Sequence, residues 1–119
     1  MTRDEFDLFC QSLKSTTHVI QWGNASVWKI GGKIFAVCAS WGAGSHAKIS
    51  FKCSDLSYAI LIEQDGIIPA PYLARAKWVQ VERADAMTDD DQKTYIKTAH
   101  EIISKKLTKA VQRELGFID

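Results

Sequence analysis

Acidic residues are missing from residues 8–54, although the whole chain of 119 residues has a formal net charge of only +1. The same stretch contains five lysines and two histidines. Residues 27–84 also have an excess of positive charge, with seven basic residues and four acidic ones. Charge that is sorted along a chain indicates a partner of opposite charge, so we expect the binding site in the middle of the chain.

Proline, glycine and long apolar runs are also scarce. The chain has two prolines, seven glycines, 46% hydrophobic and 24% charged residues, which excludes a disordered chain and is typical of a globular domain. It has no run of about 18 apolar residues that could span a membrane, and residues 1–5 lack the basic-then-apolar layout of a secretory signal. We therefore expect one domain over residues 1–119, cytoplasmic, monomeric and without a membrane partner.

The usual signatures of catalysis and metal binding are missing as well. The sequence has no glycine-rich phosphate loop, no Cys-x-x-Cys and no His-x-x-x-His spacing, and its three histidines are scattered. Its three cysteines, Cys10, Cys38 and Cys53, favour buried thiols over a disulfide framework because their number is odd and their spacing wide. We predict a protein that is not an enzyme and needs no cofactor or metal.

Local patterns predict the elements of an α+β fold, beginning with a short helix. Thr2 can cap this helix, Glu5 completes a capping box, and apolar residues recur at helical spacing up to Leu13. Residues 27–30 and 33–38 alternate as two strands, and the glycine pair between them forms a two-residue turn. The first third of the chain is therefore predicted to be a helix followed by a β-hairpin.

The remaining patterns complete the sheet and cover it. A third strand, residues 46–51, follows a tip rich in glycine and serine, and a helix is predicted over residues 55–64. Residues 77–82 alternate as a fourth strand. The last helix begins after Thr88 and ends near Gly116. We expect an antiparallel sheet, made of a meander and one further strand after a helix, with helices at both termini.

The hairpin turn sets the register of the sheet, because a two-residue loop pairs Trp28 with Phe35 and places paired residues on one face. This register predicts the following core face: Trp28, Ile30, Phe35, Val37, Ile49 and Phe51. On the opposite face, small side chains alternate with cations: Val27, Lys29, Ile34, Ala36, Cys38, His46, Lys48, Ser50 and Lys52. Trp78 and Gln80 of the fourth strand join this second face. We expect it to be a flat, positive surface.

Several segments resemble, in order and spacing, the signature of the MmcQ/YjbR family. They are Trp22-Gly23, residues 27–35 with their Gly-Lys-x-Phe core, residues 49–53, Pro71-Tyr72-Leu73 and Trp78-Val79. The resemblance covers nearly the whole chain. It implies a CyaY-like fold and a "double wing" arrangement, in which β-hairpins flank a saddle-shaped sheet and DNA binding is the proposed role.

The resemblance can be carried over residue by residue. Lys33, Lys52, Tyr72 and Trp78 fall on the family's pattern, and Arg75 stands where a lysine is usual. The chain departs from the pattern before Trp78, where Ala74, Arg75, Ala76 and Lys77 replace Asn, Lys, any residue and His. It departs again at Ala99-His100, where the family usually has a Ser-Tyr pair. The departures keep the basic character of the approach to the fourth strand, but precise polar contacts there are not carried over from the family.

The charge pattern and the resemblance together predict weak binding of nucleic acid, duplex DNA in the first place. Phosphates require accessible cations, and an aromatic side chain among cations can stack on an unpaired base or wedge into a groove. The predicted contact residues are Lys29, Lys33, Trp41, His46, Lys48, Lys52, Arg75, Lys77 and Trp78.

Plainer interpretations compete with this one. Strand lysines can simply form a solvated face, Trp78 can pack in the interior, and Trp41 can dock back onto the protein. A second hypothesis is a protein-interaction module that uses Trp41, Tyr72 and residues 67–69 as an apolar patch. A third is frataxin-like iron binding, suggested by the implied fold, but the first helix offers only three carboxylates for it.

Overall fold

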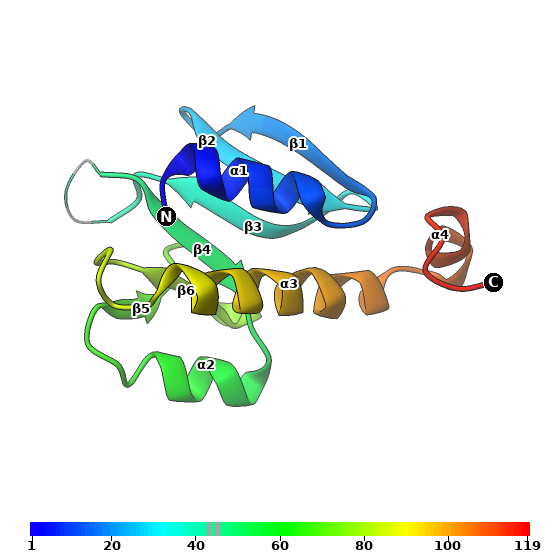
Figure 1. The fold of residues 1–119 in the computed structure, drawn as a ribbon. Coiled ribbons are helices and arrows are strands. Elements are labelled where there is room, and N and C mark those ends of the chain that lie inside the picture. Colours follow the sequence, from blue (N-terminus) through cyan, green and yellow to red (C-terminus); the bar gives the residue numbers. More distant parts are fainter. Residues whose placement is uncertain (43, 45) are drawn as a thin grey trace.

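A six-stranded antiparallel sheet forms the frame of the protein, and helices α1 and α3 lie over one of its faces (Figure 1). This computed structural model describes residues 1–42, 44 and 46–119. The strand order is β1-β2-β3-β4-β6-β5. The elements are α1 (Arg3–Ser12), β1 (Thr16–Gln21), β2 (Ala25–Ile30), β3 (Lys33–Ala39), β4 (Lys48–Lys52), α2 (Asp55–Leu61), β5 (Ile67–Pro69), the 3-10 helix η1 (Ala74–Ala76), β6 (Trp78–Val81), α3 (Asp89–Lys106) and α4 (Lys109–Glu114). The predicted α+β class is confirmed.

The first helix begins as its capping box predicts. The Glu5 amide donates to Thr2 Oγ1 at 3.1 Å, and the Thr2 amide donates to Glu5 Oε1 at 2.9 Å. These bonds satisfy two amides that a helix N-terminus would otherwise leave without partners. Phe6 and Cys10 lie one turn apart on the buried side, so α1 is attached to the sheet by an apolar stripe.

The β2–β3 hairpin has the predicted turn but not the predicted register. Ile30 pairs with Lys33, as expected, whereas Trp28 pairs with Ala36 and not with Phe35. The next residue of β2, Lys29, pairs with Ile34. Phe35 is therefore the extra residue of a β-bulge and has no partner on β2. Because side chains alternate along a strand, one extra residue sends every later side chain of β3 to the other face.

The bulge therefore changes which residues fill the main core. Ala36 and Cys38 face the helices, with Trp28, Ile49 and Phe51. The prediction that Val37 belongs to this face is wrong, because Val37 packs with Val27 on the opposite side of the sheet.

The second face of the sheet is covered by loops, not by a helix. Its buried residues are Ala25, Val27, Val37, Ala39, Ala70 and Trp78. Trp41, from the loop after β3, and Leu73, from the loop after β5, pack over this cluster. The predicted flat and open surface is consequently wrong, because these loops enclose most of it.

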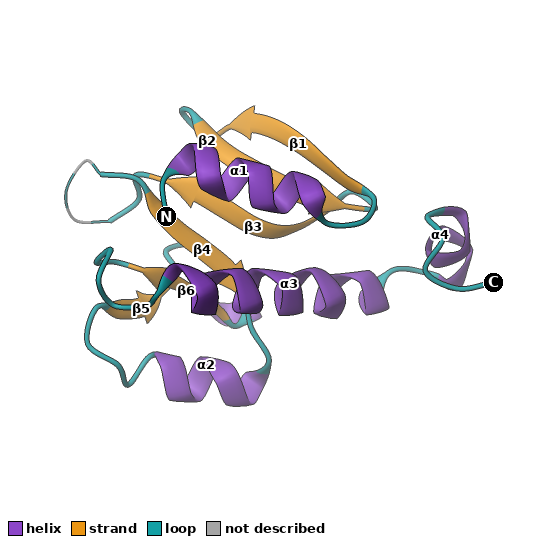
Figure 2. Ribbon diagram, viewed as in Figure 1, coloured by secondary structure: helices purple, strands orange, loops and turns teal. Residues whose placement is uncertain are grey.

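Two elements depart from the predicted boundaries in ways that matter for function. No element was predicted between the first helix and residue 27, but β1 lies there and pairs with all of β2 at the edge of the sheet. The last helix is interrupted: α3 ends at Lys106 and α4 starts at Lys109, so the single helix predicted up to Gly116 is wrong (Figure 2). Thr108 caps α4 by accepting from the Val111 amide at 3.2 Å.

Smaller differences concern the ends of three elements. β4 begins at Lys48 and not at residue 46, α2 ends at Leu61 and not near residue 64, and β6 covers only Trp78–Val81. Within the described residues, no helix has the length and apolar character needed to cross a membrane.

Candidate nucleic-acid interface

Two of the predicted phosphate-binding lysines lie inside the protein. Lys48 is 2% exposed and Lys52 is 7% exposed. The Lys48 ammonium donates to the carbonyls of His46 at 3.3 Å and Gly44 at 3.4 Å, and that of Lys52 donates to the carbonyl of Ala76. Burial, together with the nearby Lys106, lowers the pKa of Lys52. In this conformation neither ammonium can reach a phosphate at the surface.

Three further predicted residues have contacts within the protein. Trp78 is 4% exposed and packs beneath the loop after β5. The Lys77 ammonium lies over the Tyr58 ring, 5.0 Å from its centre. His46 is exposed, but its Nε2 donates to the carbonyl of Glu82 at 2.9 Å. Each of these side chains has a structural partner.

The remaining predicted cations are accessible. Lys33 and Arg75 are exposed, and Lys29 is half-buried. Lys29 is two residues from Val27 on the same strand, so it belongs to the loop-covered face of the sheet. Arg75 lies in η1, within the loop that covers that face. Lys29 and Arg75 therefore accompany Trp41 on one side of the molecule.

An aromatic cleft of about 510 Å³ opens on this side, lined by Trp22, Trp41, Tyr72 and Leu73. The ring centres of Trp22 and Trp41 are 5.7 Å apart, and those of Trp41 and Tyr72 are 5.8 Å apart. The planes meet at 44° and 85°, so neither pair is stacked face to face. Trp22 is 51% exposed and Tyr72 is 90% exposed, so much of this aromatic surface faces solvent.

Two of the cleft residues have a strained backbone. Trp22 has φ of 53° and Tyr72 has φ of 69°, in the left-handed region that bulky side chains rarely adopt. Each such residue costs on the order of 1–3 kcal/mol, and strain of this kind is concentrated at functional sites. Both positions hold a large exposed aromatic ring where glycine would be relaxed. The strain thus marks the cleft as a candidate site.

Trp41 is held in the cleft through its backbone. Its carbonyl accepts from Gln80 Nε2 at 3.1 Å, and the same amide nitrogen donates to Glu82 Oε2 at 2.6 Å. Gln80 is buried on β6, between β4 and the edge strand β5. Its bond therefore ties the backbone at Trp41 to the sheet.

Comparison with known proteins identifies the family. Residues 11–102 match the model of the YjbR family. The chain belongs to the YjbR family. The resemblance that the Trp22-Gly23 and Pro71-Tyr72-Leu73 segments predicted is therefore confirmed, and both segments contribute to the aromatic cleft.

Two solved structures are similar to this family member. A Deinococcus radiodurans protein with a DUF419 domain superposes with a TM-score of 0.80 at 20% identity, over 97% of this chain and 88% of that one. A Pseudomonas syringae protein superposes with a TM-score of 0.70 at 17% identity, over 86% of this chain and 98% of that one. No match was found among curated proteins. At these identities the similarity shows the fold alone.

Of the cleft residues, the predicted nucleic-acid site included only Trp41. Tyr72 was predicted only for the protein-interaction patch, and Leu73 was predicted for neither site. Trp22 was not predicted for either site. It lies in the turn between β1 and β2, and β1 itself was not predicted. The signal that could have found it was the Trp22-Gly23 pair of the family pattern.

A polar cluster on the other face of the sheet combines Asp7, His18 and Ser26. The Ser26 hydroxyl donates to Asp7 Oδ1 at 2.5 Å, and Trp28 Nε1 donates to the same oxygen at 2.9 Å. Because the hydroxyl proton points to Asp7, His18 Nε2 must act as the donor in its 2.8 Å contact with Ser26 Oγ. The histidine therefore does not activate the serine, which is also fully buried.

The same cluster bears on the iron-binding hypothesis. Asp7 is directed into the protein, and Glu5 is used in the capping box of α1. Among the described residues, no three His, Cys, Asp or Glu side chains come together in a way that could hold a metal ion. The acidic ridge that this hypothesis requires is therefore not presented by α1.

The cysteines are buried, as predicted. Burial raises the pKa of Cys38 to about 11 and that of Cys53 to about 12, and it also raises the pKa of Cys10. At neutral pH all three are thiols and not thiolates, so none is an activated nucleophile.

Proposed function

We propose that this YjbR-family protein binds nucleic acid by stacking an unpaired base in the aromatic cleft, and that it acts by binding and not by catalysis. The proposal rests chiefly on the two exposed rings, Trp22 and Tyr72, held in left-handed backbone on either side of Trp41. Enclosure of Lys48 and Lys52 moves the predicted contact from a lysine-bearing sheet face to this cleft.

The geometry of the cleft suits a planar ligand. Its volume of about 510 Å³ exceeds what one nucleobase needs, and neither ring pair is stacked face to face. In the edge-to-face Trp41–Tyr72 pair, the ring that contributes its edge keeps both of its faces free of its partner. Stacking of a base on an aromatic side chain contributes about 1–3 kcal/mol and depends little on which base is bound. We therefore expect weak sequence preference.

The charge around the cleft suits a phosphate backbone. Arg75 follows Tyr72 by three residues, and Lys29 lies on the same face of the sheet. No carboxylate occurs in residues 8–54, so β1, β2 and β3 contribute no negative charge that would repel phosphates. One carboxylate, that of Glu82, does lie beside the loop that carries Trp41, where it accepts from Gln80 Nε2. With few exposed cations, we expect a dissociation constant on the order of 10⁻⁴ to 10⁻⁶ M and a steep loss of affinity with salt.

Fluorescence anisotropy with a labelled single-stranded DNA and a duplex of the same sequence tests the proposal. Tyr72→Ala should weaken single-strand binding by roughly 5- to 150-fold, which corresponds to the loss of one stacking contact. Leu56→Ala is the matched control, because Leu56 is an exposed apolar residue on α2, outside the cleft. Absence of binding at low salt, or equal effects of the two substitutions, would refute the proposal.

A protein partner is the second candidate, favoured by the aromatic and aliphatic side chains that line the cleft among the described residues. Exposed tryptophan and tyrosine side chains are typical anchors of protein interfaces. Of the patch predicted at residues 67–69, Ile67 is buried and cannot contribute, whereas Pro69 is exposed. A stoichiometric protein complex that survives high salt and is lost in Tyr72→Ala would favour this candidate, since phosphate contacts weaken steeply as salt rises.

A further inference from the structure

A second cleft lies among α1, α3 and α4, away from the aromatic cleft. Its volume is about 1010 Å³. β2 starts next to the turn that carries Trp22 and ends at Ile30. The next residue, Gly31, lies against Leu107 of the α3–α4 junction and Val111 of α4. The two clefts are therefore at opposite ends of β2, and the second one depends on the helix break that the sequence did not predict.

The second cleft is strongly basic. Its described lining includes Lys14, Lys97, Lys105 and Lys109 but a single carboxylate, Glu101. The whole chain has a net charge of only +1, so positive charge is concentrated here well beyond the average of the molecule. Lys97, Lys105 and Lys109 are exposed, and Lys105 and Lys109 stand on either side of the helix break. A cleft of this charge attracts anions.

The walls of the cleft are fixed by hydrogen bonds between distant segments. The buried Gln112 of α4 donates through Nε2 to the carbonyls of Leu107 at 2.8 Å and Lys105 at 3.4 Å. These carbonyls end α3 and would otherwise repel an anion. On the other side, Lys14 donates to the carbonyl of Gly116 at 2.6 Å, and the Ser15 hydroxyl donates to that of Leu115 at 3.0 Å. The cleft is therefore formed before any ligand arrives.

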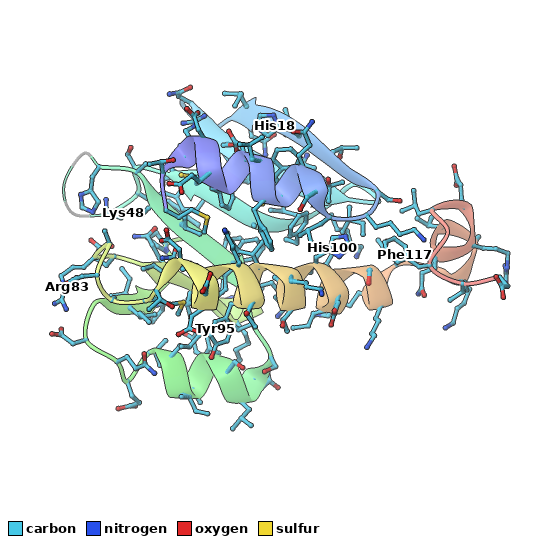
Figure 3. All side chains as sticks on the ribbon, in the orientation of Figure 1. His18, Lys48, Arg83, Tyr95, His100 and Phe117 are labelled. Carbon is cyan, nitrogen blue, oxygen red and sulfur yellow. The ribbon has the colours of Figure 1, made fainter. Side chains whose placement is uncertain are left out.

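Aromatic rings provide an apolar part of the lining. His100 and Phe117 lie 5.8 Å apart between ring centres, and both lie near the α3–α4 junction (Figure 3). His100 is held in place by its Nε2, which donates to the carbonyl of Lys14 at 2.8 Å, and by an edge-to-face contact with Phe35. Phe9 of α1 also lines the cleft. Cations and rings thus face one shared space.

We propose that this cleft binds a small phosphorylated ligand that carries an aromatic ring, such as a nucleoside diphosphate. Lys97, Lys105 and Lys109 bind the phosphates. The ring lies on the face of Phe117 opposite the Lys14 ammonium, which is 5.4 Å from the centre of the Phe117 ring. The volume is at the upper end of that of small-molecule sites, which favours a small ligand over an extended chain. This site is independent of the aromatic cleft.

ADP is the probe. Inorganic pyrophosphate and adenosine are tested separately, because they represent its phosphate part and its ring part. Amide shifts in NMR spectra should move in residues 97–117 on addition of ADP, and adenosine should bind at least tenfold more weakly. The double variant Lys105→Gln and Lys109→Gln should weaken ADP binding at least tenfold. The control pair, Lys33→Gln and Lys106→Gln, removes the same charge from exposed positions outside the cleft lining and should change binding less than twofold.

The outcomes separate this proposal from the nucleic-acid proposal. Tyr72→Ala should leave ADP binding unchanged, because Tyr72 lines only the other cleft. Shifts confined to Trp22, Trp41 and Tyr72, equal losses in the two double variants, or no binding of ADP would overturn the inference. If single-stranded DNA alone moves residues 97–117, the cleft is a nucleic-acid surface and the small-ligand proposal is wrong.

Discussion

Tyr72 illustrates at the scale of one residue how binding and stability can oppose each other. Its side chain is 90% exposed, so little burial is lost when it is removed, while its backbone is held at φ of 69°. Glycine adopts this conformation without a steric penalty. The aromatic ring is therefore maintained at a cost to the stability of the fold.

We predict that Tyr72→Gly raises the free energy of unfolding by about 1 kcal/mol, because relief of strain exceeds the entropy that glycine loses on folding. The same substitution should weaken single-stranded DNA binding as Tyr72→Ala does. Urea unfolding followed by circular dichroism measures the first effect, with Tyr72→Phe as the control that keeps both ring and strain. A clear loss of stability in Tyr72→Gly would mean that ring packing outweighs the strain.

The buried thiols make stability depend on pH at alkaline values. An unfolded cysteine loses its proton near pH 8.5, whereas burial raises the pKa of Cys38 to about 11 and that of Cys53 to about 12. Between these values the unfolded chain binds fewer protons than the folded one, so the free energy of unfolding falls as pH rises.

We predict a fall of about 1.4 kcal/mol per pH unit for each such thiol above pH 9, and no contribution from the thiols below pH 8. Denaturant unfolding of the wild type and of Cys38→Ala at pH 7, 9 and 10 measures the slope. The variant should be less stable at pH 7, because it loses packing, and should have the shallower slope. Identical slopes would show that Cys38 does not titrate on unfolding.

The β2–β3 turn shows at the scale of elements how one hairpin supports the α3–α4 junction. A Cβ added to Gly31 would come within 2.8 Å of Leu107 Cδ1, whereas one added to Gly32 would meet nothing within 4 Å. Both glycines have positive φ, 57° and 81°, so alanine is strained at either position. The two positions differ in packing alone.

We predict that Gly31→Ala lowers the free energy of unfolding by about 1–3 kcal/mol more than Gly32→Ala, because only the first adds overpacking to backbone strain. Thermal unfolding of both variants gives this difference. Gly31→Ala should also displace Leu107 and weaken ADP binding in the basic cleft. Equal stabilities would show that the junction can move away from the turn at no cost.

Sequence patterns predicted those elements whose signals are local. The capping box of α1, the turn at Gly31-Gly32 and the cap of α3 at Thr88 were all found, because each depends on residues within one turn of chain. The bulge beside Trp28 has no local sequence signal. Most residues of β1 are polar, so the sequence did not predict a strand there. Thr108 is a residue type that caps helices, but apolar residues continue at helical spacing on both sides of it. That spacing favoured one long helix.

At the scale of the whole molecule, the sheet has one face beneath helices and one beneath loops. Alternation along β4 correctly placed Lys48 and Lys52 opposite the main core, but it could not predict what would cover them. One covering residue, Trp41, lies in the loop that leads directly into β4. The others, Leu73 and Ala76, lie between β5 and β6, in a separate segment after α2. The sequence therefore predicted part of the candidate site, namely Trp41 and Arg75. Only the fold shows that Trp22 and Tyr72 lie beside Trp41 in one cleft.

The four tryptophans allow one measurement to test the central claim, that nucleic acid binds in the aromatic cleft. Titration of the protein with a short single-stranded DNA at low salt, followed by the indole N–H signals in NMR spectra, distinguishes all four. We predict that Trp22 and Trp41 shift and that added salt reverses the shifts. Trp28, bonded to Asp7, and Trp78, buried under the loop after β5, should stay in place as internal controls. Unmoved signals of Trp22 and Trp41 at saturating DNA would contradict the account.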